Sequence, residues 1–170
     1  MRLLLIAAAA LPLLAGPAIA LAAPPSAGSP GSLVLSGSLA GGGEAGVSGR
    51  AGLAEMELLA GFELPGSAAG TGLVFRPELA LALGPTPRTH FALRPGLRVA
   101  LPSTPLWLRA GFDFSNARGD AAWRWLLLGA AWEVRLTGFF GLFAEIDTGV
   151  PVSSRAGLPF MARVGATFRP

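Results

Sequence analysis

The stretch AEMELLAGFELP, residues Ala54 to Pro65, places acidic side chains in a chain that is 52% hydrophobic and only 14% charged. Glu55, Glu57 and Glu63 all occupy odd positions, while most of the large apolar residues between them occupy even ones. A period of two is the spacing of a β-strand with two unlike faces. Part of the window also fits helical spacing, so the neighbouring sequence must decide between strand and helix.

The same period recurs along the chain and favours strands. In PLWLRAGFDF, Leu108 and Phe112 alternate with Arg109 and Asp113. Short runs of this kind are separated by Gly, Pro and Ser, and no segment between them is long enough for a crossover helix. We therefore predict an all-β, antiparallel, up-and-down meander of eight strands. The predicted strands lie near residues 32–41, 52–64, 71–84, 89–101, 105–114, 122–136, 139–149 and 158–168.

The N-terminus has the pattern of an exported protein. Arg2 precedes an apolar segment at 3–14, and the small residues at 20–22 form a cleavage site. We predict a signal peptide at 1–22 and a flexible Pro/Ser/Gly leader at 23–31, followed by one β-barrel domain at 32–168. The chain contains no cysteine, so it has neither disulfides nor thiol chemistry. The formal net charge is +3, without a basic cluster that would indicate nucleic-acid binding.

Most of the ten acidic residues share one face of the predicted strands with arginines and glycines. Glycine weakens an exposed strand, but inside a narrow barrel it leaves room for long charged side chains. We therefore expect this face to line a lumen in which acids pair with arginines, because buried charges must be paired. The predicted lumen network comprises Glu55, Glu57, Glu63, Arg76, Glu78, Arg94, Arg98, Arg109, Asp113, Glu133, Arg135, Glu145, Asp147 and Arg163.

Large aromatic residues of the apolar face gather near the ends of the predicted strands, as in the two aromatic girdles of a membrane barrel. Such a barrel is closed because an open sheet edge cannot be hydrogen-bonded in hydrocarbon. One predicted girdle, at the periplasmic end if the N-terminus is periplasmic, contains Phe62, Phe75, Phe140 and Phe168. The other contains Phe91, Phe112, Phe114 and Phe160.

The exported leader, the eight alternating runs, the charged interior face and the near-terminal Phe168 together resemble the small eight-stranded outer-membrane barrels of the OmpA/OmpX type. This resemblance is one of pattern. It implies a transmembrane barrel in a Gram-negative outer membrane, in contact with outer-membrane lipid and inserted by the barrel-assembly machinery. It also implies a monomer with no nucleic-acid partner.

Nothing in the sequence indicates an enzyme, a cofactor or a metal site. His90 is the only histidine and has no cysteine beside it, and GGGEAG (Gly41–Gly46) lacks the helix of a nucleotide-binding fingerprint, so we expect a surface loop there. The leading hypothesis is a non-enzymatic structural or surface barrel whose lumen is plugged by ion pairs. A narrow channel for ions or small solutes is one alternative, and a soluble, lipocalin-like barrel that binds an apolar ligand is another.

The strand register predicts particular ion pairs. A connection centred near Thr86 would set Glu78 opposite Arg94, and the next connection sets Asp113 on the other side of Arg94. The same register sets Arg98 opposite Arg109, a like-charge pair that we expect Glu55 or Glu57 to neutralise. It also sets Pro77 opposite Pro95, where we expect a bulge because proline lacks a ladder donor.

Overall fold

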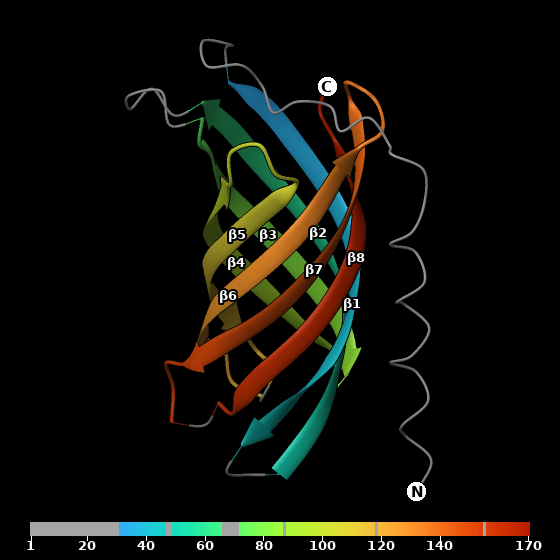
Figure 1. The fold of residues 1–170 in the computed structure, drawn as a ribbon. Coiled ribbons are helices and arrows are strands. Elements are labelled where there is room, and N and C mark those ends of the chain that lie inside the picture. Colours follow the sequence, from blue (N-terminus) through green and yellow to red (C-terminus); the bar gives the residue numbers. More distant parts are fainter. Residues whose placement is uncertain (1–30, 47–48, 66–71, 87, 118, 155) are drawn as a thin grey trace, which may run out of the picture.

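The computed structural model describes residues 31–46, 49–65, 72–86, 88–117, 119–154 and 156–170. The predicted signal peptide and residues 23–30 of the predicted leader lie outside this part of the chain. The described residues form one closed antiparallel barrel in which each strand pairs with its neighbour in sequence and β1 closes onto β8 (Figure 1). The strands are β1 (Ser32–Gly46), β2 (Gly49–Pro65), β3 (Val74–Thr86), β4 (His90–Ala100), β5 (Leu106–Ser115), β6 (Ala122–Arg135), β7 (Phe140–Pro151) and β8 (Leu158–Phe168).

The predicted fold class is confirmed, and most strand boundaries differ from the prediction by one to three residues. The largest difference is in GGGEAG, which continues β1 to Gly46 and is not the expected loop. Backbone pairing explains this, because Gly43 lies opposite both Gly52 of β2 and Phe160 of β8. A Cβ on Gly42 would lie 2.0 Å from the carbonyl oxygen of Phe160, so glycine permits this close approach of β8.

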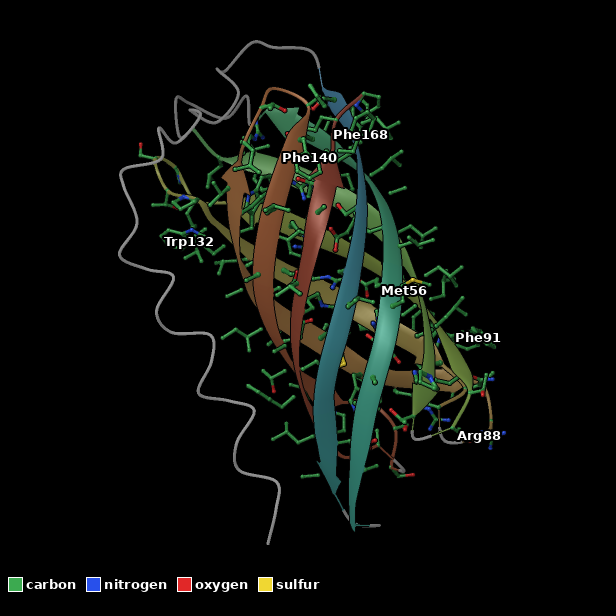
Figure 2. All side chains as sticks on the ribbon, turned by 90° about the vertical axis from the view of Figure 1, so that its right-hand side faces the viewer. Met56, Arg88, Phe91, Trp132, Phe140 and Phe168 are labelled. Carbon is green, nitrogen blue, oxygen red and sulfur yellow. The ribbon has the colours of Figure 1, made fainter. Side chains whose placement is uncertain are left out.

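The two faces of the barrel wall differ as the alternation predicts. Large apolar side chains project outward from every strand, and Leu39 of β1 and Val164 of β8 are 64% and 62% exposed. Phe140 and Phe168 lie at the barrel end that holds the start of β1 and the end of β8, and Phe91 lies at the opposite end (Figure 2). We call these the terminal end and the distal end. A soluble barrel with an apolar core does not fit this arrangement, because its large apolar side chains would point inward.

The predicted pairing of β3 with β4 is wrong by two residues. Glu78 lies opposite Gly96, and Arg94 lies opposite Ala80. Strand pairing continues to Gly84 opposite His90, so the centre of the β3–β4 connection lies one residue later than the prediction. A displacement of one residue in the turn centre moves each pairing by two, which leaves the inner and outer faces unchanged. The predicted β4–β5 register is correct, with Arg98 opposite Arg109.

The two prolines occupy a regular ladder, and the expected bulge between them is absent. Pro77 lies opposite Leu97, and Pro95 lies opposite Leu79. The pairings on their other sides, with β2 and β5, omit both prolines, which fits their missing N–H groups. In the described ladders, register shifts occur instead at Ala54/Met56 of β2 and at Asp113/Phe114 of β5.

Candidate functional site: the charged lumen

The interior of the barrel holds every residue of the predicted lumen set. All of these residues are buried except Arg135, whose side chain is 17% exposed at the terminal end. The contacts between them form two groups. We call the first the central network; it contains Glu55, Glu57, Glu78, Arg94, Arg98, Arg109, Asp113, Glu145, Asp147 and Arg163. We call the second the end network; it contains Glu63, Arg76, Glu133, Arg135 and Arg169.

Arg94 of β4 joins three strands within the central network. Its Nε donates to Asp113 Oδ2 across 2.7 Å, as the β4–β5 register predicts. Its guanidinium also donates to Glu57 Oε2 across 2.8 Å and binds both carboxylate oxygens of Glu55. The predicted bond from Arg94 to Glu78 is wrong, because the shifted β3–β4 register carries Glu78 two residues along the barrel.

Glu78 instead binds both members of the like-charge pair, Arg98 and Arg109. Its carboxylate lies 2.7 Å from Arg98 Nε and 2.8 Å from Arg109 Nε. Glu145 of β7 reaches the same two guanidiniums from across the lumen, at 2.7 Å from Arg98 and 3.3 Å from Arg109. Of the two acids expected to neutralise this pair, Glu57 contributes at 3.2 Å from Arg109 Nη1.

Arg163 of β8 closes the central network. It lies 2.7 Å from Glu57 and 2.7 Å from Asp147, so β8 is joined to β2 and β7 through the lumen as well as through the sheet. Each guanidinium in the network thus contacts two or more carboxylates from different strands. This arrangement satisfies the requirement that a buried charge be paired with charges of opposite sign.

The end network contains a residue that the sequence analysis missed. Arg169 follows the last residue of β8, yet its side chain turns into the barrel and is only 7% exposed. It donates to Glu63 Oε1 across 2.9 Å and binds Glu133 Oε1, while its backbone N–H donates to Phe139. Arg76 lies between the same two carboxylates, at 2.6 Å and 3.2 Å. Arg169 has the inward parity of Arg163 and Thr167, but the predicted strand ends at Phe168, so the predicted lumen set did not include it.

A buried tryptophan lies near each end of the lumen. Trp107 of β5 packs at the terminal end with Val74, Ala100 and Ala131, and the guanidinium carbon of Arg76 lies 4.0 Å from the centre of its ring. Trp125 of β6 packs at the distal end with Leu127 and Ala156, and its Nε1 donates to the Gly157 carbonyl across 2.8 Å. The charged lumen is therefore flanked by apolar packing on both sides.

A β-bulge near the distal end turns Arg124 inward. Asp113 lies opposite Trp125 and Phe114 opposite Trp123, which leaves Arg124 as the extra residue of β6. Its side chain is buried and donates to the carbonyl of Ser115 and to Asp120 Oδ1, so it holds the β5–β6 connection from the lumen side. Strict alternation would have placed Arg124 on the lipid-facing side, and the bulge is the physical reason for the difference.

His90 lies at the distal end of the lumen, with Nε2 3.7 Å from Glu55 and Nδ1 2.9 Å from the Arg88 carbonyl. Within the described residues, no group of histidine, cysteine and acidic side chains has a metal-binding arrangement, and no helix is apolar and long enough to cross a membrane. The arrangement of the lumen therefore indicates charge pairing across strands as its chemistry.

No protein-family model matches the chain, and no curated protein sequence matches it. Two solved structures share its fold. The crystal structure of Neisserial surface protein A is similar with a TM-score of 0.55 and 12% identity, over 84% of this chain and 100% of that one. A structure from the de novo design of transmembrane β-barrels is similar with a TM-score of 0.51 and 13% identity, over 85% of this chain and 100% of that one. The chain therefore has the fold of small eight-stranded transmembrane barrels, as the resemblance implied.

Proposed function

We propose that this protein is a non-enzymatic outer-membrane barrel with a sealed, ion-paired lumen and a structural or surface role. The observation that carries the proposal is that the apolar and charged faces of the barrel wall are reversed relative to those of a soluble protein. Large apolar side chains cover the outside, whereas the acids and arginines of the two networks are buried inside. Such a surface is stable against lipid, and a closed barrel leaves no unpaired strand edge in the hydrocarbon.

The lumen contacts support a plug over a pore. Conduction requires water or ions to pass between Arg98, Arg109, Glu78 and Glu145, which hold one another at 2.7–3.3 Å. Removing one member from such a cluster leaves its partners buried and unpaired, which costs several kcal/mol. A narrow channel for ions or small solutes remains the less favoured function, because it requires these ion pairs to open.

We base the orientation on a periplasmic N-terminus, which places the start of β1 and the end of β8 on the periplasmic side. The terminal end faces the periplasm, and the distal end, with the β1–β2 hairpin, faces outward. The barrel reaches the membrane through the barrel-assembly machinery and functions as a monomer. Its aromatic residues at both ends, such as Phe91 and Phe168, lie at the two lipid–water interfaces.

Fractionation and gel mobility test this proposal together. Full-length protein expressed in a Gram-negative host should sediment with the outer membrane and resist extraction at high salt. Because a closed barrel stays folded in mild detergent, unheated samples should migrate differently from boiled ones. Proteoliposomes should also resist swelling in isotonic solutions of small sugars. Recovery in the soluble periplasmic fraction, or swelling above that of empty liposomes, would contradict the proposal.

A further inference from the structure

At the distal end an exposed cation lies against the β5–β6 connection, and the strands that this connection joins line an apolar depression on their outer face. Arg88, in the β3–β4 connection, is exposed. It lies three residues before the lipid-facing Phe91, in the bend that precedes β4. Figure 2 shows Arg88 just beyond Phe91 at this end of the barrel. Its guanidinium therefore lies at the level where lipid headgroups begin.

The position of Arg88 is coupled to the β5–β6 connection. Its Nη1 lies 3.1 Å from the point that a Cβ on Gly119 would occupy, and Gly119 adopts a φ of 109°, which favours glycine. The buried Arg124 holds this connection from the lumen side through hydrogen bonds to Ser115 and Asp120. Arg88 thus lies against a connection that is held in place from inside the barrel.

The strands that this connection joins carry an apolar depression on their outer face. A depression of about 410 Å³ is lined by Phe112 of β5, Trp123 of β6 and Val152, which follows β7. The ring of Trp123 packs edge-on against Phe112 and Phe114, and the backbone of Val152 bonds to Arg124. Aromatic and apolar side chains around a concavity of this kind suit an acyl chain.

The charge distribution along the sequence favours an anionic headgroup at the same end. The connections at the terminal end, residues 66–73, 101–105 and 136–139, contain no charged residue. The segments at the distal end include arginines and one acid, Asp120, which is bonded to the buried Arg124; Arg88 is the exposed arginine among the described side chains. Arginine binds phosphate oxygens in a bidentate manner, and cations near a membrane surface attract anionic lipids.

We propose that the distal end binds a phosphoglycolipid of the outer leaflet. Arg88 contacts its phosphate, and the depression formed by Phe112, Trp123 and Val152 holds part of an acyl chain. This site places the bound lipid on one side of the barrel, at the distal ends of β4 to β7. The inference rests on the proposed outer-membrane function with the distal end facing outward. Because binding is measured on folded protein in detergent, its outcome is independent of whether the lumen conducts.

Native mass spectrometry of the mature protein, titrated with bisphosphorylated lipid A, tests the proposal. Arg88→Gln should weaken binding roughly fivefold, and Arg88→Lys should retain most of it. Trp123→Leu should weaken binding, whereas Trp132→Leu, which removes an equally exposed tryptophan from the other part of β6, should leave it unchanged. Val152→Asn provides a second test of the depression. Heat-modifiable mobility verifies that each variant is folded.

Two lipid controls test whether binding depends on the phosphate and whether it requires a glycolipid. Dephosphorylated lipid A should bind at least fivefold more weakly than the bisphosphorylated form, and phosphatidylglycerol should also bind more weakly than the bisphosphorylated form. Unchanged binding by Arg88→Gln, or equal binding of the phosphorylated and dephosphorylated forms, would overturn the phosphate site. Equal binding of phosphatidylglycerol would overturn the assignment to a glycolipid, and equal losses from Trp123→Leu and Trp132→Leu would overturn the acyl depression.

Discussion

Arg94 Nε donates to Asp113 Oδ2 across 2.7 Å inside the barrel, and the same guanidinium binds Glu55 and Glu57 of β2. These side chains come from β2, β4 and β5, so the contact joins β4 to its neighbour β5 and, past β3, to β2, which is not its neighbour in the sheet. The closed wall and the ion pairs therefore support each other. Formation of the ion pairs requires the closed barrel, and the closed barrel requires its inward charges to be paired.

Replacement of Arg94 by methionine should destabilise the barrel strongly. It leaves Glu55, Glu57 and Asp113 with fewer cations in a buried site, at a cost of roughly 3–5 kcal/mol. The free energy of unfolding, from urea titration in lipid vesicles, measures the effect. Arg135→Met is the matched control, because Arg135 is partly exposed and donates to Glu63 at the end of the barrel, outside the central network. Equal losses for the two variants would argue against the central network as a stabilising unit.

The side chain of Arg169 should stabilise the folded barrel by binding the end of β8 to acids in the lumen. Its replacement by glutamine removes charged hydrogen bonds to Glu63 and Glu133, each worth about 1.5–3 kcal/mol. We expect a loss within that range for the variant, since Arg76 still binds both acids. Urea unfolding measures it, and deletion of Pro170 alone is the control. A variant as stable as the wild type would show that the side chain of Arg169 contributes nothing to closure.

The sequence allowed the strand number, the facing of the side chains and the composition of the lumen to be predicted, because period-two alternation depends only on strand geometry. It could not locate the β3–β4 turn within one residue, since GPTPRT offers several turn centres with the same facing. This small error moved Glu78 from Arg94 to Arg98. The bulge that turns Arg124 inward breaks the alternation, so pattern reasoning gives no indication of it. Arg169 keeps the inward parity of β8 and was missed because the predicted strand ends at Phe168.

The cost of a charge on the outer face should depend on its depth in the membrane. Leu81 lies opposite Leu58 and Leu93, well inside β3, and is 44% exposed. Leu81→Arg should cost roughly 2–4 kcal/mol in a bilayer, whereas Leu158→Arg, at the first residue of β8, should cost about 0–1. Folding efficiency and unfolding free energy in vesicles measure both. If both substitutions cost the same, the outer face is not in contact with hydrocarbon at the depths assigned here.

The facing of the strands can be tested residue by residue, since the chain has no cysteine of its own. Single nitroxide labels at Leu79, Leu81 and Leu83 should collide readily with oxygen dissolved in the bilayer. Labels at the buried Ala80 and Ala82 should be protected from both oxygen and a polar relaxant. Electron paramagnetic resonance gives the accessibilities. Maxima at Ala80 and Ala82 would mean that the inner and outer faces are exchanged.

Single-channel recording in planar bilayers tests the sealed, ion-paired lumen most directly. Folded wild-type protein, verified by heat-modifiable mobility, should produce no stepwise conductance in 1 M KCl, a test condition chosen to weaken exposed ion pairs through screening. A double variant, Arg98→Ala with Glu145→Ala, removes one bonded pair from the middle of the lumen and should admit ions if it remains folded. Regular conductance steps from the wild-type barrel itself would contradict the account and favour the narrow channel.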